Sequence, residues 1–333
     1  MSAPQIWAKI WGCRGSIPTP LYASQVRGKI QRALRLAKDV DLETDADIDA
    51  FIDNLPFEVS GTYGGNTSCV ELATESDSEH LLLDAGSGLK SFSEEYMRRD
   101  ASKTPATFHF VMSHLHWDHI QGFPFFGPAY IPGNKIIIYG YHSDIERLFN
   151  AQMNDAWFPV DYDTFRADIE FRPMEPESSF EICGYSAKGI WQNHPGVAFG
   201  YRFEKNGRAI VYSTDSEHDL DKVSDTYHFI DFFKDADLLI FDAQYTLQDN
   251  IVSKQNWGHS NNVIAVELAM RSNAKKLLIF HHDPANSDEN LSEFLRITLE
   301  HQKVVERRFT ASNVSVPDLN IGLAHDGLIV PID

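Results

Sequence analysis

Four residues of types that commonly bind metal ions lie within six positions of the chain, at His114, His116, Asp118 and His119. Imidazoles and a carboxylate suit zinc, manganese or iron(II), and two such ions roughly 3.5–4 Å apart can share one activated hydroxide. The apolar run before this H-x-H-x-D-H motif predicts a strand, and the residues after it predict the first turn of a helix. On such a loop His114 and His116 can face one ion, while Asp118 and His119 reach the other. The alternative is a polar loop that binds no metal, but such a loop would require neither the alternating histidines nor Asp118.

A two-metal site also needs ligands from distant segments, and three candidates follow apolar runs that resemble strands. They are His194, Asp215 and His281. Strand ends are where a parallel sheet presents functional groups. Each candidate alone has an ordinary explanation, because a lone histidine is often structural and an aspartate after a strand often caps a helix. Together with the first motif they predict a binuclear centre, in which His282 is the alternative ligand to His281 and Asp283 is a further pocket residue.

In this order, from Ile6 to about Ile332, the motifs resemble those of the metallo-β-lactamase superfamily of hydrolases. The resemblance implies an α/β (α+β) fold, an αββα sandwich of two mixed β-sheets with helices outside. It also implies that Asp84, in the stretch LLLDAGSG, orients metal ligands without binding the metal itself, although a helix cap is an equally simple role. The implied ligand sets are His114, His116 and His194 for one ion, Asp118, His119 and His281 for the other, and Asp215 as the bridge between them.

Two further segments resemble the ribonuclease Z and cyclic-phosphodiesterase branch of that superfamily. One is the glycine-rich stretch at residues 11–18 with the later YGGNTS, in which Asn66 and Ser68 are weaker substrate-binding candidates. The other is WGHS, where the resemblance implies that His259 contacts the scissile phosphate. Because diester hydrolysis needs a proton for the leaving alkoxide, His259 is predicted to be the general acid, and Asp118 to steady a metal-bound hydroxide. The helix predicted after Ser260 would offer N–H groups to the phosphate; a plain helix-start histidine is the alternative.

The predicted function is that of a metal-dependent hydrolase with a binuclear site, a phosphodiesterase acting on a small or cyclic nucleotide-type diester. The cofactors would be two divalent transition-metal ions, with zinc favoured over manganese or iron. Three alternatives stay open: a ribonuclease Z-like nuclease, a hydrolase of another ester or lactam, and a non-catalytic ligand sensor on the same fold.

Charge and composition limit the classes of molecule that the chain is expected to bind. The net charge of -19 argues against a surface built for long nucleic acid, which normally needs a basic face. A small diester is compatible with that charge, because the metals and a few cations such as Arg14 or Lys188 set the local field. The three cysteines form no spaced motif and indicate a reducing, cytoplasmic setting. We expect no membrane span, since the apolar runs have only strand length.

The chain is predicted to form a single domain over residues 1–333, with a helical insertion at about residues 20–60. Within it, residues 24–38 predict a helix with Ile30 and Leu34 on one face, and an acidic helix should follow. Such an insertion would cover a pocket rim or make a dimer contact, so a homo-oligomer stays open. Aromatic residues also concentrate between Gly122 and Arg166, where they could stack on a base or simply pack loops onto the sheet. This stretch lacks the glycine/proline-rich arm of ribonuclease Z.

Overall fold

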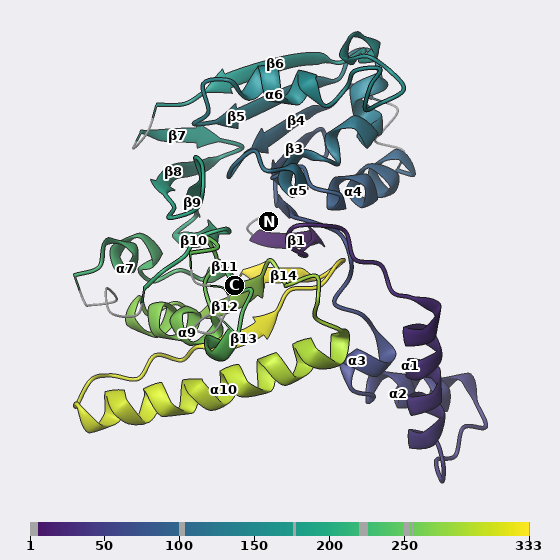
Figure 1. Ribbon diagram of the computed structural model, residues 1–333, viewed down its shortest axis with the longest axis vertical. Helices are drawn as coiled ribbons and strands as arrows, with labels where there is room; N and C mark the ends of the chain where they lie inside the picture. Colours follow the sequence, from purple (N-terminus) through teal and green to yellow (C-terminus); the bar gives the residue numbers. More distant parts are fainter. Residues whose placement is uncertain are drawn as a thin grey trace.

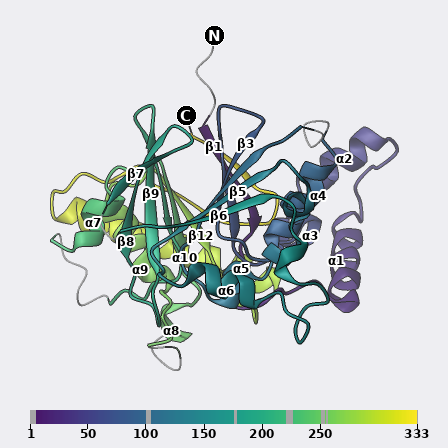
Figure 2. The ribbon, with the colours of Figure 1, turned by 90° about the horizontal axis from the view of Figure 1, so that it is seen from above.

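The computed structural model describes residues 6–99, 104–175, 178–219, 226–249, 254 and 256–332. Its strands form two seven-stranded sheets that pack face to face (Figures 1 and 2). In order across the first sheet the strands are β14 (Ile329–Ile332), β1 (Ile6–Gly12), β2 (Cys69–Leu72), β3 (Glu79–Leu83), β4 (Thr107–Val111), β5 (Lys135–Gly140) and β6 (Asp168–Pro173). In order across the second they are β13 (Asn320–Leu323), β12 (Lys276–Phe280), β11 (Leu238–Asp242), β10 (Arg208–Ser213), β9 (Phe199–Lys205), β8 (Tyr185–Trp191) and β7 (Ser179–Ile182).

Both sheets are mixed, and they repeat one pattern. In the first sheet β3, β4, β5 and β6 are parallel, while β14, β1, β2 and β3 pair antiparallel. In the second sheet β10 to β13 are parallel, while β7 to β10 pair antiparallel. The parallel strands of each sheet end at the same edge, which is where their following loops can meet.

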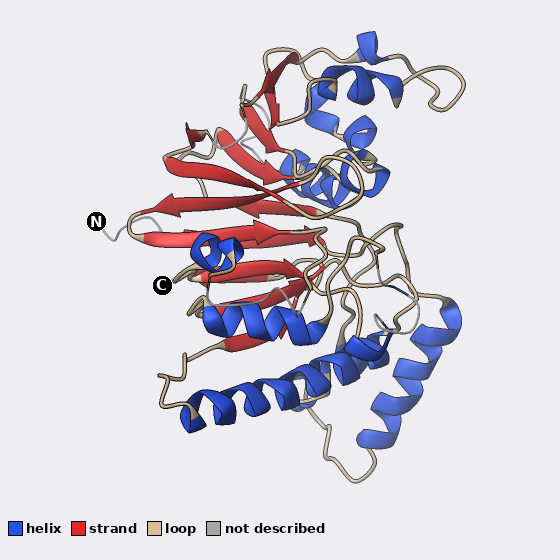
Figure 3. Ribbon diagram, turned by 60° about the vertical axis from the view of Figure 1, so that its left-hand side comes forward, coloured by secondary structure: helices blue, strands red, loops and turns tan. Residues whose placement is uncertain are grey.

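Helices cover the outer faces of the two sheets (Figures 2 and 3). In chain order they are α1 (Ala23–Leu36), α2 (Asp45–Asp53), α3 (Phe57–Ser60), α4 (Gly88–Met97), α5 (Trp117–Ile120), α6 (Ile145–Ala151), α7 (His228–Phe233), α8 (Leu247–Asp249), α9 (Asn262–Arg271) and α10 (Asp288–Ala311). Short 3-10 turns are η2 (Phe123–Phe125), η3 (Gly127–Tyr130) and η4 (Tyr162–Thr164). This arrangement confirms the predicted αββα sandwich. Within the described ranges, no helix combines the length and apolar character needed to cross a membrane.

Side chains alternate between two core layers along each central strand. In β3, Leu81 and Leu83 point into the layer between the sheets, whereas Leu82 packs under α4. In β11, Leu238 faces the layer between the sheets and Leu239 packs under α7 and α9. Strands buried on both faces are apolar at most positions, which explains their hydrophobic runs. The buried sheets hold the strand ends in fixed places.

The insertion at residues 20–60 contains α1, α2 and α3, which lie together beside one end of α10 (Figure 1). Its anchor is Lys29, whose Nζ donates to the carbonyls of Glu58 and Gly61 and lies 2.7 Å from Asp288 Oδ2. The face of α1 that carries Leu34 is open to solvent, and Leu34 is 68% exposed. The single-domain organisation stays a prediction.

Candidate metal centre

The candidate site lies where strands of both sheets reach their carboxyl ends. Each predicted metal ligand comes from a loop that follows such a strand, and the packing of the two sheets brings these loops together. The residues concerned are His114 to His119 after β4, His194 after β8, Asp215 after β10 and His281 after β12.

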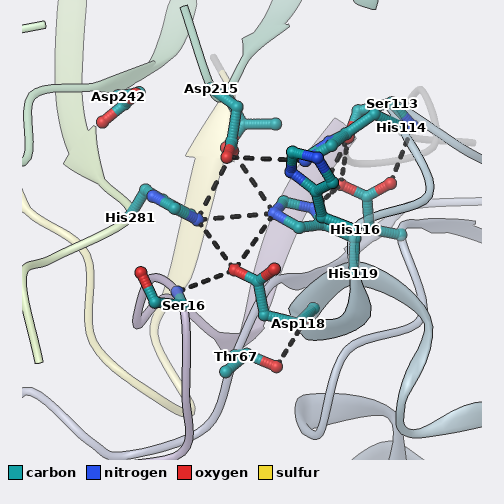
Figure 4. Close-up of polar contacts among 12 residues, drawn as sticks. Ser16, Thr67, Ser113, His114, His116, Asp118, His119, Asp215, Asp242 and His281 are labelled. Carbon is teal, nitrogen blue, oxygen red and sulfur yellow. Dashed lines mark hydrogen bonds and ion pairs between the residues drawn. The ribbon is translucent and has the colours of Figure 1, made fainter. Parts of the chain in front are cut away.

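Asp215 stands between two groups of imidazoles. Its Oδ2 lies 3.6 Å from His114 Nε2 and 3.8 Å from His194 Nε2. Its Oδ1 lies 3.3 Å from His119 Nε2 and 3.4 Å from His281 Nε2 (Figure 4). Because each carboxylate oxygen faces a different group, Asp215 has the position of a bridging ligand.

The remaining predicted ligands complete the two groups. His116 Nδ1 lies 3.1 Å from His194 Nε2, on the side of Asp215 Oδ2. Asp118 Oδ2 lies 3.2 Å from His281 Nε2 on the other side, and the backbone N–H of Ser16 donates to it at 2.7 Å. The structure therefore brings all seven predicted ligands together.

The donor set fits two divalent metal ions. Imidazole nitrogens and carboxylate oxygens in such groups are the ligands that zinc, manganese and iron(II) accept. Burial, followed by neighbouring histidines, holds the pKa of His114 well below its usual range, so its ring is neutral as a ligand must be. Its buried Nε2 has no hydrogen-bond partner within the described part of the chain. A polar atom left without a partner in the interior is costly, and a metal ion would supply that partner.

Negative charge on the other side of Asp215 attracts a cation. Burial alone would lower the pKa of His119, but Asp215, Asp118 and Asp84 outweigh it and raise that pKa well above its usual value. The same carboxylates would be neutralised by a divalent ion in place of a proton. This is the charge balance that a metal centre requires.

Two carbonyl or carboxylate groups fix the orientation of the imidazoles. Asp84 Oδ2 accepts from His119 Nδ1 at 2.8 Å and from Tyr212 OH at 2.7 Å, while both its oxygens accept from Ser113. The carbonyl of Gly258 likewise accepts from His194 Nδ1 at 2.8 Å. With Nδ1 engaged, Nε2 of each ring is left to face the cluster. This is the role expected for Asp84.

Three residues of the cluster have left-handed backbone conformations, with φ of 58° at Asp84, 42° at Asp215 and 60° at His281. Such values are uncommon for residues other than glycine, and they concentrate at functional sites. The turn they produce after each strand directs the side chain inward across the sheet edge.

His259 lies at the edge of this cluster and is paired with Asp242, the last residue of β11. Its Nδ1 is 2.8 Å from Asp242 Oδ2 and 4.0 Å from Asp215 Oδ2. Burial alone would lower the pKa of His259, but Asp242, followed by Asp215 and Asp118, outweighs burial and raises the pKa to about 9. Sequence reasoning missed Asp242. It ends an apolar strand just as Asp215 follows one, so the same signal could have found it.

The loop that carries His259 depends on a glycine. Gly258 has a φ of +84°, and a Cβ there would lie 2.4 Å from His194 Nδ1. Glu217 holds the loop by accepting from the backbone N–H groups of Asn256 and Gly258. The WGHS segment thus positions two histidines, His194 through its carbonyl and His259 directly.

Known proteins with similar sequences identify the family of this chain. A family model described as a beta-lactamase superfamily domain matches residues 79–282, a range that holds every predicted metal ligand. The chain belongs to this superfamily. Ribonuclease Z of Prochlorococcus marinus (strain MIT 9301) is 22% identical over 301 residues, which cover 74% of this chain and 92% of that enzyme.

Solved structures of the superfamily share the fold. The metallo-beta-lactamase fold protein YhfI from Bacillus subtilis has a TM-score of 0.62 and 18% identity, with 99% of this chain and 100% of that one covered. A diphosphatase of the PhnP family has a TM-score of 0.57 and 16% identity, with 98% and 97% covered. At these identities the likeness is one of fold. The superfamily assignment predicts which residues bind the metals, and the roles of those individual residues stay predictions.

The weaker candidates next to His281 lie outside the cluster. His282 Nε2 is 2.8 Å from the carbonyl of Ala324, and burial lowers its pKa to about 3. Asp283 Oδ1 accepts from the backbone N–H of Ala285. His281, and not the alternative His282, has the geometry of a ligand, because its Nε2 lies 3.2 Å from Asp118 Oδ2 and 3.4 Å from Asp215 Oδ1.

Asn66 and Ser68 lie in the loop beside Asp118. The Asn66 side chain donates to Asp326 and Ser91 and accepts from Ser87, so its polar atoms are used within the protein. Ser68 is buried, and its Oγ has no partner among the described residues. These contacts indicate a structural role for Asn66, while the role of Ser68 stays a prediction.

The expected phosphate contact at the start of α9 is wrong. The first N–H groups of α9 are engaged, because Val263 and Ile264 donate to the side chain of Asn261 and Asn262 donates to the carbonyl of Tyr245. The guanidinium of Arg14 is 3% exposed and donates to backbone carbonyls. The contribution of Arg14 to the local field stays a prediction.

Proposed function

We propose that this chain is a metal-dependent phosphodiesterase that hydrolyses a small or cyclic nucleotide-type diester, with zinc as the favoured metal. The observation that carries the proposal is the pair of His259 and Asp242 beside the cluster around Asp215. Diester hydrolysis expels an alkoxide that needs a proton, and a histidine that stays protonated at neutral pH can donate it.

The residues around the cluster would have separate roles in the reaction. Two divalent ions bound here would lower the pKa of a water molecule and offset the charge of the phosphoryl oxygens. Asp118, fixed by the N–H of Ser16, would accept a hydrogen bond from the attacking water and orient it. His259 donates through Nδ1 to Asp242, so its Nε2–H is the proton left for the leaving oxygen. Asp242 thereby stabilises the charged form of the acid.

The relatives support a phosphorus-centred reaction. They include a ribonuclease Z and a diphosphatase, whose names both describe cleavage of phosphorus–oxygen bonds. The second candidate function is therefore a ribonuclease Z-like nuclease. The observation in its favour is that the similarity extends over 92% of the Prochlorococcus enzyme. The net charge of -19 favours the small diester.

A panel of substrates separates these functions. We expect the chain, loaded separately with zinc, manganese and iron, to hydrolyse bis(p-nitrophenyl) phosphate and nucleoside 2′,3′-cyclic phosphates. It should leave the lactam nitrocefin and thioesters nearly untouched, since His259 and the glycine-rich opening resemble features of the phosphodiesterase branch of the superfamily. Precursor transfer RNA with a 3′ trailer tests the nuclease. Rapid lactam turnover without diester turnover would overturn the proposal, and a strong preference for precursor transfer RNA would favour the second candidate.

A further inference from the structure

A pocket of ≈ 800 Å³ opens beside the metal loop, between α5, η2 and the segment that contains α6 and residues 152–158. We call it the aromatic pocket. The residues used in the argument are Trp117, Gln121, Phe125, Gln152 and Trp157. Although the chain is strongly acidic overall, none of the described residues that line this pocket is an aspartate or glutamate. The one charged side chain among these described lining residues, Arg147, is paired with Asp144, so the lining suits an uncharged aromatic group.

Aromatic rings in this pocket are far more exposed than their neighbours in sequence. Phe123 and Phe126 are fully buried in the core under α4. By contrast, Trp117 is 69%, Phe125 56% and Trp157 76% exposed. Large exposed aromatic side chains gathered around one hollow are typical of ligand sites and are not needed for the core.

The aromatic pocket is joined directly to the metal loop. Trp117 stands between His116 and Asp118 in the chain, so one turn of helix presents the ring outward and the carboxylate to the cluster. Gln121 Nε2 donates to Thr67 Oγ1 at 3.1 Å, and Thr67 Oγ1 donates to the carbonyl of Asp118 at 2.6 Å. The pocket and the metal cluster therefore share one short segment of the chain, so a nucleotide with its phosphate at the cluster would have its base on the side of this pocket.

Gln152 adds a polar feature to the wall. Neither its Nε2 nor its Oε1 has a hydrogen-bond partner in the described part of the chain, and both atoms are hidden from solvent. A buried amide without partners costs free energy, and turning the Gln152 side chain into the pocket would let a ligand with a matching donor and acceptor recover that cost. The paired donor and acceptor of a glutamine amide match the N6 and N7 atoms of adenine.

We propose that the aromatic pocket binds the nucleobase attached to the scissile phosphate, with a preference for adenine. Trp117 and Trp157 provide stacking surfaces, and Gln152, with its amide turned into the pocket, hydrogen-bonds the base edge. This inference rests on the proposed phosphodiesterase function and names its substrate class. The base belongs to a mononucleotide diester or to the end of an RNA, two sources with the same recognition chemistry.

Calorimetric titration of the full chain tests the pocket without relying on turnover. AMP should bind at least about 5-fold more tightly than ribose 5-phosphate, which lacks the base. Trp157→Ala should weaken AMP binding by about 5- to 100-fold and leave ribose 5-phosphate unchanged, since stacking involves only the base. Gln152→Leu, which keeps the size of the side chain, should weaken AMP in the same direction. Leu34→Ala removes an apolar side chain that is 68% exposed on α1, does not line the pocket and should change neither ligand.

The outcomes separate this inference from the proposed function. Equal affinities for AMP and ribose 5-phosphate, or AMP binding unchanged by both pocket variants, would overturn the base site even if bis(p-nitrophenyl) phosphate were hydrolysed. Absence of diester turnover by the parent chain would instead remove the proposed function. A short single-stranded RNA ending in adenosine, titrated in parallel, shows from its affinity relative to AMP which source of the base the pocket prefers.

Discussion

Replacing Asp215 with asparagine is expected to empty both metal positions at once. The parent should carry about two transition-metal ions per chain, and the variant well below one, because a single carboxylate faces both groups of imidazoles. Asparagine is the informative choice. It keeps the size of the side chain and tolerates the φ of 42° at this position, whereas alanine would add backbone strain. Elemental analysis of the purified proteins measures the result.

Asp237→Asn is the matched control for that loss. Asp237 is also a buried aspartate, but it precedes β11 at the opposite end of the sheet, where it pairs with Arg208 and Lys275. Its replacement should lower stability and leave the metal content unchanged. If Asp215→Asn kept as much metal as the parent, Asp215 would not be the bridge.

His259→Ala is expected to slow hydrolysis of a diester with a poor leaving group by about 10²- to 10⁴-fold, because the alkoxide then departs without a proton. A diester with p-nitrophenolate as leaving group should lose much less, since that anion is stable unprotonated. Steady-state turnover of both diesters, with elemental analysis of each sample, measures the contrast. Asp242→Asn should act in the same direction but more weakly, because it removes the partner that keeps His259 protonated.

The leaving-group contrast distinguishes three roles for His259. A residue that only contacts phosphate would slow both diesters alike, and that result would eliminate the general acid. A metal ligand would show itself by a loss of metal, a necessary check because His259 lies within reach of His194 and Asp215. His301→Ala, a histidine on α10 beside Glu267, is the control and should affect neither diester.

Much of the fold was predictable because its signals are local. The Asn206–Gly207 pair supplies the two positive φ values, 53° and 74°, of the turn between β9 and β10. Ser287 caps α10 by accepting from Asn290, as a serine before a helical pattern should. The metal ligands were predictable for a related reason, since each follows an apolar strand and such strands end at one edge.

The features that sequence did not reveal depend on partners far along the chain. Lys29 is buried because it pairs with Asp288, which lies more than 250 positions later in the chain. The helical pattern around Lys29 does not indicate that partner. Asn261 directly precedes a predicted helix, and its side chain caps that helix by accepting from the N–H groups of Val263 and Ile264. From the sequence, the N–H groups at this helix start were expected to meet a phosphate instead. The partnership of Asp242 with His259 likewise depends on the loop before α9 lying against the segment that follows β11, which only the folded structure defines.

The most direct test of the account is a titration of the chelator-treated chain with zinc or manganese, followed by turnover of bis(p-nitrophenyl) phosphate. The cluster around Asp215 is claimed to hold two ions that act together, so turnover should rise until about two ions per chain are bound and should disappear when chelator is restored. Undiminished turnover by the metal-free chain, or two bound ions with no diester turnover under any of the metals, would contradict the account.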